Sequence, residues 1–378
     1  MALTGAELAE YDATRRLARE RLAAAAEAGP KGRLDRTLIA ALAEAGLVQR
    51  IFPSSHGGTQ PGEVSAFTLC LLREAVAVES SEAETALAMQ GLGAYPVLQS
   101  GRPEIASRWI PAIARGEAVP AFALTEPDAG SDAAAIALAA ERDGNGWRLT
   151  GEKTWISNAP DADVYTVFAR TTPGAGAAGV TAFAVPGDVP GLSGRPLDLV
   201  APHPVGSLVF DGVLVPDDHR LGELDGGFAV AMRTLDRFRP SVGAFAVGIA
   251  QAALEAAIAH AGTRHAFGGP LRELQAVAHK LADMATSLHA ARLVVYDAAR
   301  AFDAGAEPLT IRASMAKLLA TETAQRVVDD AIQIHGARAL EVGHLLERLY
   351  RDVRAPRIYE GASEVQRTII ARRLYPRA

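Results

Sequence analysis

The sequence contains very little cysteine. Cys70 is the only one among 378 residues, so no disulfide can form within the chain. It lies in the apolar run Phe67–Leu72, which favours a buried and unreactive thiol. The nine histidines are scattered and no His-Glu-x-x-His pair occurs, so the usual ligand spacings of a zinc site are missing. We therefore expect no metal.

Long apolar runs and an excess of positive charge are missing too. No run of about eighteen apolar residues occurs, and the first residues have no basic stretch before an apolar core, so neither a membrane span nor a secretory signal is expected. A net charge of -6 argues against broad nucleic-acid binding and leaves any anionic ligand to local arginine clusters. With 49% apolar and 22% charged residues, the chain is typical of a soluble protein, and we expect it in the cytoplasm.

Three segments of different character follow one another. Ala, Leu, Glu and Arg dominate up to about Gly116, with apolar residues at helical spacing. Short runs of alternating apolar and polar residues, separated by Gly, Pro, Asn and Asp, fill Val119–Pro216. A helical pattern resumes from Gly227. This order predicts a mainly α protein with a central β-domain, divided into an N-terminal helical domain (1–119), the β-domain (120–222) and a C-terminal helical bundle (223–378).

The C-terminal part carries several helix signals. Ser241 is expected to cap a helix that continues to His260. Further helices are expected over Leu271–Phe302, from Thr310 to a left-handed Gly336, and from Ser363, which has Gln366 at capping-box spacing.

One nucleotide-binding pattern can be set aside. Gly174–Gly179 matches Gly-x-Gly-x-x-Gly, with Asp198 about twenty residues further on. That fingerprint must lead from a strand into a helix, whereas the following Val180–Val185 alternates like a strand. We interpret the glycines as a loop between two strands.

A polar loop is predicted where the first helical segment meets the β-segment. The stretch Ala121–Asp132 places Thr125, Gly130 and Ser131 in one irregular region. Hydroxyls and free backbone amides in such a loop can bind a phosphate or the polar edge of a ring. A plain turn at a domain boundary explains the same residues equally well.

A second element, Gly151–Asn158, reads as a strand followed by a turn. Trp155 and Ser157 are two residues apart and should project from the same face. An indole beside a hydroxyl suits the side of a flat heteroaromatic ring, although Trp155 could equally belong to the core.

The third element holds the most reactive candidate. In Arg351–Gly361, Glu360 lies in a short connection between two helices that Pro356 and Gly361 should make rigid. A single glutamate in a loop is usually solvated, so its position alone does not make it catalytic.

Taken together, these segments resemble the acyl-CoA dehydrogenase family, and the resemblance covers nearly the whole chain. Single motifs would be weak, but seven of them follow one another in the family's order. They are LTEPDAGSD at 124–132, GEKTWISNA at 151–159, VPDDHRLG at 215–222, DRFRPSVGAFAVGIAQAALE at 236–255, TRHAFGGPLRELQ at 263–275, QIHGA at 333–337 and RIYEGASEVQR at 357–367.

The resemblance implies FAD bound between the β-domain and a C-terminal four-helix bundle, in a dimer or tetramer. One group of residues would contact the flavin end of the cofactor: Phe122, Leu124, Thr125, Gly130, Ser131, Trp155, Ile156 and Ser157. A second group would reach the pyrophosphate and adenosine of a neighbouring subunit's FAD: Arg264, Phe267, Gln275, Gln333, Gly336 and Ala337. Ala362 and Glu364 would lie near the cofactor, and the substrate would be faced by Ser131, Asp236, Arg239, Gly361 and Arg372.

The implied reaction is the FAD-dependent oxidation of an acyl thioester to its trans-2-enoyl form, with the acyl group on CoA or on a carrier protein. Glu360 would remove the α-proton, its backbone N–H would stabilise the enolate, and the flavin would accept hydride from the β-carbon. An electron-transfer flavoprotein would take the electrons. Phe238 occupies the helix position where some family members place the base, which supports Glu360 in that role.

The chain also departs from the family pattern. Ala362 replaces the usual threonine, Ala337 replaces the second glycine of its segment, and Asp128 stands where glycine is common. A flavin monooxygenase of the same fold is the alternative activity, although such relatives generally lack the glutamate. A helical scaffold without FAD is a third hypothesis, opposed by the retained Thr125 and Trp155.

Overall fold

The computed structural model describes residues 3–375, and internal contacts divide the chain into two compact units. The helical unit comprises Met1–Ala23, Ser65–Glu84 and Asp236–Ala378. The β-unit comprises Ala24–Val64 and Thr85–Leu235. Each unit is therefore assembled from segments that are far apart in sequence, and the N-terminal helices are shared between them.

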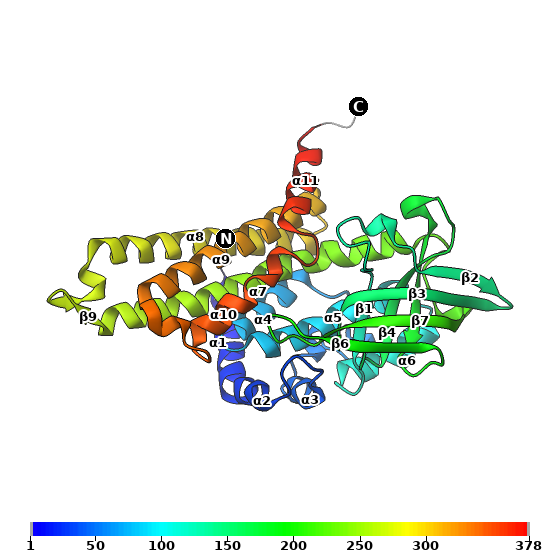
Figure 1. Cartoon of the computed structure of the whole chain (residues 1–378), viewed down its shortest axis with the longest axis horizontal. Coiled ribbons are helices and arrows are strands. Elements are labelled where there is room, and N and C mark those ends of the chain that lie inside the picture. Colours follow the sequence, from blue (N-terminus) through cyan, green and yellow to red (C-terminus); the bar gives the residue numbers. More distant parts are fainter. Residues whose placement is uncertain (1–2, 376–378) are drawn as a thin grey trace. The chain divides into compact units, whose positions relative to one another are not determined.

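The helices and strands follow the predicted order of helical, β and helical segments (Figure 1). The helices are α1 Gly5–Leu17, α2 Ala23–Ala28, α3 Arg36–Glu44, α4 Ala66–Ala77, α5 Ser81–Ser100, α6 Pro103–Ala114, α7 Gly227–Thr263, α8 Gln275–Asp303, α9 Leu309–His335, α10 Leu345–Asp352 and α11 Ser363–Leu374. The strands are β1 Pro120–Ala123, β2 Ala139–Asp143, β3 Gly146–Ser157, β4 Val164–Arg170, β5 Val180–Pro186, β6 Leu192–Leu197, β7 Val205–Pro216 and β8 Arg220–Leu221, with a small hairpin of β9 His265–Ala266 and β10 Gly269–Pro270.

The β-unit is organised around one mixed sheet. Its strand order is β6-β7-β3-β2-β4-β5-β8, and β1 pairs in parallel with β4 at a branch from this path. The core includes Tyr165, Phe183 and Phe210, all almost completely buried. Helix α5 approaches β1 so closely that a Cβ on Gly93 would lie 2.8 Å from the backbone nitrogen of Ala121. This contact fixes the strand from which the predicted flavin loop departs.

The glycine-rich stretch forms a loop, as predicted. Gly176–Gly179 makes a short 3-10 turn between β4 and β5, and Val180 begins β5 directly after it. A dinucleotide fingerprint would require a helix at that point. The loop interpretation is confirmed.

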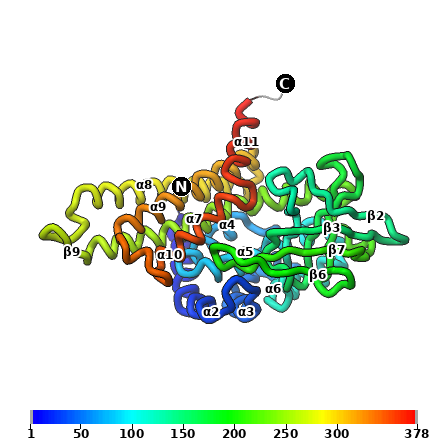
Figure 2. Tube along the Cα trace, in the orientation of Figure 1, coloured from blue at the N-terminus to red at the C-terminus, as the bar shows by residue number. Residues whose placement is uncertain are grey.

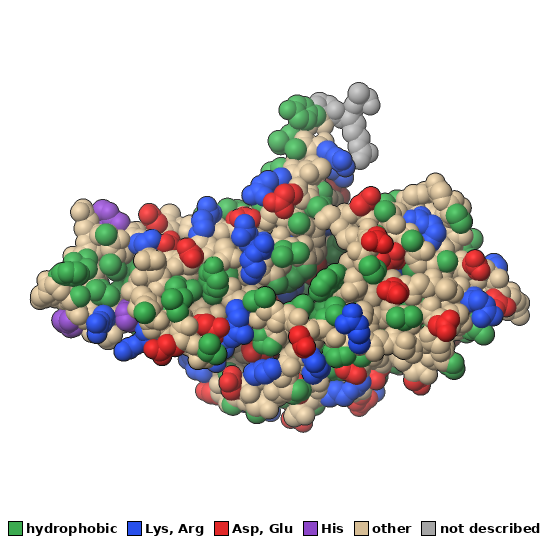
Figure 3. Space-filling model, viewed as in Figure 1, with side chains coloured by type: hydrophobic (Ala, Val, Ile, Leu, Met, Phe, Trp, Pro, Cys, Tyr) green, Lys and Arg blue, Asp and Glu red, His purple; other side chains and the backbone are tan. Residues whose placement is uncertain are grey.

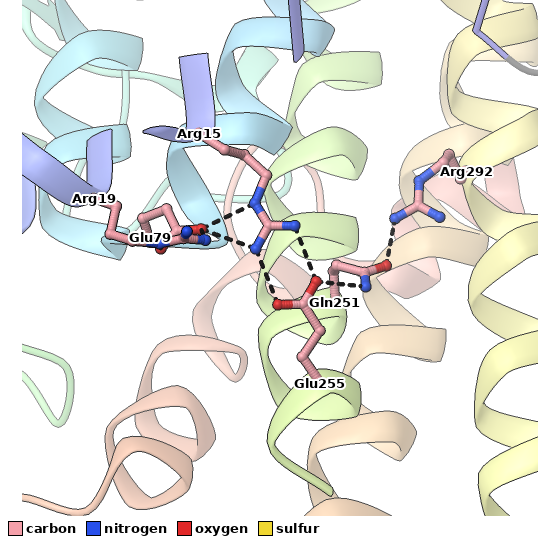
Figure 4. A network of polar contacts seen from close by, with 6 residues as sticks. All are labelled: Arg15, Arg19, Glu79, Gln251, Glu255 and Arg292. Atoms are coloured by element: carbon pink, nitrogen blue, oxygen red, sulfur yellow. Dashed lines mark hydrogen bonds and ion pairs between the residues drawn. The ribbon is translucent and has the colours of Figure 1, made fainter. Parts of the chain in front are cut away.

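In the helical unit α4 packs against the long helices α7 and α8, and α9 packs against both of these; their path can be followed in Figure 2. An ion-pair network ties α1 to these helices (Figure 4). Arg15 contacts both Glu79 and Glu255 at 2.9 Å, and Gln251 bonds to Glu255 and Arg292. These contacts hold α1 to α7 across 240 residues of sequence.

Helix α7 is apolar and long enough to cross a membrane, judged by length and composition alone. However, 72% of its most apolar window is buried inside the structure. An apolar helix of this kind is the usual core helix of a bundle.

Several predicted helix boundaries are wrong. Ser241 does not cap a helix: α7 already begins at Gly227, and the Ser241 hydroxyl donates to the Phe238 carbonyl within it. Ser and Thr hydroxyls can donate to preceding carbonyls inside a helix, so the presence of Ser241 does not require a helix to begin there. Gly336 has φ 69° and ψ -152°, which is not the left-handed helical conformation, and a 3-10 turn follows it.

The capping box at α11 is also wrong. Its N-cap is Ala362, which has no side chain able to accept a hydrogen bond. The Ser363 hydroxyl donates to Glu322 and the Gln366 amide donates to the carbonyls of residues 360 and 361. Both side chains therefore serve tertiary contacts that sequence spacing does not reveal. Helix α10 was not predicted.

Candidate active site

The predicted base lies on a strained turn just before α11. Glu360 and Gly361 both have positive φ angles, of 52° and 93°. A non-glycine residue rarely adopts this conformation, and such residues concentrate at functional sites. At Gly361 a Cβ would also lie 2.4 Å from the side-chain nitrogen of Gln366, so that amide would have to shift. We call residues 359–362 the Glu360 turn.

The carboxyl of Glu360 is poorly satisfied. Its Oε2 atom is buried and has no hydrogen-bond partner among the described residues. Burial raises the pKa of this carboxyl above its ordinary value, while Arg73, Lys317 and Arg239 oppose the shift. A buried carboxyl oxygen without a partner is costly in a fold, which makes Glu360 a functional candidate.

The backbone of the Glu360 turn is held by side chains from three helices. Lys317 on α9 donates to the Gly361 carbonyl at 2.6 Å, and Arg239 on α7 donates to the Glu360 carbonyl at 3.3 Å. Gln366 on α11 donates to both carbonyls, at 3.2 and 3.0 Å. The donors fix the main chain and leave the carboxyl unpaired.

Three of the four predicted substrate residues of the helical unit lie at the Glu360 turn, and Arg372 does not. Arg239 is ion-paired with Asp236 at 2.7 Å, and Asp236 accepts a hydrogen bond from Thr310 at 2.9 Å. Asp236, Arg239 and Gly361 are thus brought together around the turn. Arg372 lies exposed in the last turn of α11 and does not join this group.

A buried arginine adds charge beside the turn. Arg73 on α4 is 2% exposed, forms an ion pair with Glu84 and donates to the Ser241 hydroxyl at 2.7 Å. It is the largest single influence that lowers the pKa of Glu360. Its charge is already paired, so it belongs to the permanent surroundings of the carboxyl.

In the β-unit the two predicted flavin segments lie side by side. The Thr154 amide donates to the Thr125 carbonyl at 3.0 Å. Beneath them, Lys153 forms a buried ion pair with Glu126 at 2.7 Å and also donates to the Leu124 carbonyl at 2.9 Å. Glu126 accepts two further bonds from the amides of Ala137 and Leu138. Burial lowers the pKa of Lys153 to about 8, and Glu126 opposes that shift.

This pairing leaves the flavin candidates facing outward. Trp155 is 57% exposed, so its alternative interpretation as a core residue is wrong. It lies within the irregular part of β3 between Lys153 and Ile156 and has φ 58°, whereas its neighbour Ile156 is buried. Gly130 and Ser131 are exposed, Phe122, Thr125 and Ser157 are half-buried, and Leu124 is buried.

A third group of candidates lies at one end of the helical unit. Arg264, Phe267, Gln275, Gln333, Gly336 and Ala337 are all exposed. They lie in or beside the β9–β10 hairpin or around the end of α9, which meets the end of α7 through stacked rings of His335 and His260. The space-filling view in Figure 3 shows histidines and exposed hydrophobic side chains at this end.

This end is far from the Glu360 turn within the same unit. Arg239 contacts the turn, and α7 continues from there to Thr263, a length of roughly 36 Å at 1.5 Å per residue. The third group therefore does not join the Glu360 turn of its own chain.

Comparisons with known proteins match the chain along nearly its whole length. The acyl-CoA dehydrogenase N-terminal, middle and C-terminal domain models match residues 6–117, 121–213 and 225–375. The chain is 36% identical over 368 residues to cyclohexane-1-carbonyl-CoA dehydrogenase of Geobacter metallireducens, covering 96% of each. The chain belongs to the acyl-CoA dehydrogenase family. It is an oxidoreductase that acts on CH–CH groups.

Solved structures superpose closely on the chain. Butyryl-CoA dehydrogenase from Megasphaera elsdenii has a TM-score of 0.93 at 33% identity, covering 99% of both chains. The structure of PigA with FAD and proline has a TM-score of 0.92 at 28% identity, covering 99% of this chain and 98% of that one.

The residues of this acyl-CoA dehydrogenase fit FAD. The loop that carries Thr125 and Ser131 is anchored from below by Lys153 and Glu126, so its hydroxyls remain available. A Cβ on Gly130 would meet nothing within 4 Å, which leaves open space above the loop backbone. The exposed indole of Trp155 adds an aromatic face beside it. Among residues 3–375, no cluster of three or more His, Cys, Asp or Glu could hold a metal ion.

Sequence reasoning missed the residues that support these candidates. Glu126 and Lys153 stand inside the two quoted motifs, but only the fold shows that they pair. The sequence gives only a weak indication of Lys317, which is a lysine among the apolar residues that form the buried face of α9. Such a lysine is almost never fully buried unless it has a partner.

Proposed function

We propose that this enzyme oxidises a saturated acyl thioester to the trans-2-enoyl thioester, with Glu360 as the base that removes the α-proton. The acyl group rides on CoA or on a carrier protein. The buried, unpartnered Oε2 of Glu360 on a backbone fixed from three helices supports this assignment most strongly. FAD is the cofactor.

The α-proton of a thioester is only weakly acidic, so its removal needs a desolvated and correctly placed carboxylate. Burial already raises the pKa of Glu360. The proton moves from the α-carbon to the carboxylate, and negative charge develops on the thioester oxygen. The backbone N–H of Glu360 is proposed to donate to that oxygen. The fixed turn keeps this amide aligned with the base.

Bound FAD supplies the acceptor for the hydride that leaves the β-carbon. Thr125, Ser131 and Ser157 would hydrogen-bond to its polar ring edge, and Phe122, Leu124, Gly130, Trp155 and Ile156 would line the ring. Ala362 and Glu364, which adjoin the Glu360 turn, are proposed to lie near the same cofactor.

We further propose a homo-oligomer, dimer or tetramer, in which the third group of residues reaches a neighbouring subunit's cofactor. The separation of about 36 Å along α7 supports this division of labour. An electron-transfer flavoprotein as acceptor and a cytoplasmic location complete the proposal.

The decisive experiment mixes the purified yellow enzyme anaerobically with a panel of acyl thioesters while flavin absorbance is recorded. We expect at least one to bleach the flavin, and the Glu360→Gln variant to keep its FAD but bleach about 10²–10⁴-fold more slowly. The exposed Glu341→Gln serves as a matched control and should bleach at the wild-type rate. Equal rates for Glu360→Gln and wild type would disprove the assignment of the base.

The same assay separates the carriers and the alternative activity. Matched acyl groups on CoA and on a carrier protein show which form is the substrate. The flavin monooxygenase alternative predicts no bleaching by any thioester and rapid oxygen consumption by the reduced enzyme. The presence of Glu360 favours dehydrogenation.

A further inference from the structure

Lys317 is buried yet has no carboxylate in ion-pair contact among residues 3–375. It is 0% exposed, and its ammonium donates to the Gly361 carbonyl at 2.6 Å. A neutral amide would be sufficient to satisfy a carbonyl, and Gln366 already donates to the same oxygen. An additional buried positive charge at this point is costly unless it acts on a neighbouring charge.

The neighbouring charge is the carboxylate of Glu360. Burial lowers the pKa of Lys317 to about 8, and Glu360 opposes this shift more than any other group. Conversely, Lys317 is one of three cations that oppose the raised pKa of Glu360. Arg73 and Arg239 are both neutralised by ion pairs, with Glu84 and Asp236. Lys317 is the cation among the three whose charge is not so paired.

We propose that Lys317 is a positioning residue for the base, fixing the Glu360 turn through the Gly361 carbonyl and supplying the positive charge that keeps the Glu360 carboxylate ionised. The proposal rests on the proposed function of Glu360. It assigns to Lys317 a role in proton abstraction without contact with the substrate.

The groups facing the turn must all be considered in any pH experiment. Arg73 comes from α4, Arg239 from α7, Lys317 from α9, and the phenol of Tyr359 from the turn itself. The anions that act on these groups are Glu84, Asp236, Glu322, Asp352 and Glu364. Burial lowers the pKa of Lys317 to about 8, so this cation loses its charge within the pH range of the experiment.

Three variants separate charge from hydrogen bonding. Lys317→Gln removes the charge and keeps a donor, Gln366→Leu removes a donor and keeps the charge, and Lys317→Arg keeps the charge. The readout is the rate of flavin bleaching by butyryl-CoA in anaerobic stopped flow, measured from pH 5.5 to 9.5 after FAD content has been checked. If butyryl-CoA does not bleach the wild type, the fastest thioester of the panel replaces it.

We expect Lys317→Gln to move the acid limb of the rate profile to higher pH. Loss of a positive charge raises the pKa of Glu360, so less of the base is ionised, and the rate on that limb falls on the order of tenfold. Above pH 9 the variant and the wild type should converge, because Lys317 of the wild type is then largely neutral. Gln366→Leu should lower the rate evenly without moving the limb, and Lys317→Arg should keep the limb in place.

A stability measurement tests the same coupling without turnover. Urea unfolding of the wild type, Lys317→Gln, Glu360→Gln and the double variant at pH 8 forms a double-mutant cycle. We expect Lys317→Gln to destabilise the protein less when Glu360 is already Gln. Additive effects, or a Lys317→Gln profile that superimposes on the wild type, would overturn the proposal. If no thioester bleaches the flavin but the cycle shows coupling, the proposed function fails while the charge relationship stands.

Discussion

Two lysine–glutamate arrangements, one in each unit, use the same chemical groups in opposite ways. In the β-unit, Lys153 and Glu126 are both buried and are joined by a direct ion pair of 2.7 Å. In the helical unit, Lys317 is buried as deeply but donates to the Gly361 carbonyl, and the Oε2 of Glu360 has no partner. Full pairing makes the first arrangement structural, and incomplete pairing leaves the second able to react.

The backbone supports this difference. Glu126 accepts two main-chain amides in addition to Lys153, so the anion organises the chain around it. Around Glu360 the backbone accepts the hydrogen bonds and the carboxylate does not, because cationic and amide side chains donate to the carbonyls of the turn. The carboxylate is then held by its backbone and not by its own hydrogen bonds, which leaves its oxygens available to a substrate.

The largest effect on stability is expected in the β-unit. Glu126→Gln leaves Lys153 buried without a counter-charge, and breaking such a pair should reduce the free energy of unfolding by about 3 kcal/mol. The flavin loop would lose its anchor, so FAD content should fall as well. Urea denaturation and the flavin-to-protein absorbance ratio measure both. The control is Glu152→Gln, an exposed position next to Lys153 on β3, with an expected change in the free energy of unfolding within about 0.5 kcal/mol. An equally stable Glu126→Gln variant would remove the contrast between the two arrangements.

Glu360→Gln should instead increase the free energy of unfolding near pH 8. The folded protein raises the pKa of Glu360, so it disfavours the ionised form relative to the unfolded chain. Stability from this group is therefore present below the unfolded pKa and lost as pH rises through the folded pKa. A neutral amide avoids the loss, and we expect Glu360→Gln to gain about 1 kcal/mol at pH 8. The gain should disappear in acid.

Thermal unfolding of wild type and Glu360→Gln between pH 4 and pH 8 checks this prediction. A constant difference across the range would show that the effect comes from packing and not from ionisation. A loss of stability at pH 8 would show that the cations around the turn require the carboxylate for structure.

The sequence was sufficient for the architecture because that information is local. Alternating runs predicted the β-segment, and the glycine-rich loop was recognised from the strand after it. Glu360 was also selected as the candidate base, but through the motif RIYEGASEVQR and not through its surroundings. The surroundings depend on Arg73, Arg239 and Lys317, which are far apart in sequence and meet only in the fold.

The same distinction explains the wrong boundaries. Ser241, Ser363 and Gln366 have the spacing or residue type of caps, and local rules assign them to helix ends. In the structure their side chains serve Arg73, Glu322 and the Glu360 turn. Where a buried hydrogen-bond acceptor from another part of the fold lies nearby, a polar side chain bonds to it in place of capping its own helix. Sequence spacing does not show whether such an acceptor is present.

The smallest predicted effect concerns the helix that follows the base. The N-cap of helix α11 is Ala362, which provides no side-chain cap, whereas the N-cap of α3 in the β-unit is Asp35, which accepts from the Leu38 amide at 3.0 Å. Ala362→Thr should add the missing acceptor and increase the free energy of unfolding by about 0.5–1 kcal/mol. The control is Ala371→Thr, further along the same helix, where threonine is slightly unfavourable. If both substitutions destabilise the protein equally, the start of α11 has no room for a cap, and the family's usual threonine is absent here for steric reasons.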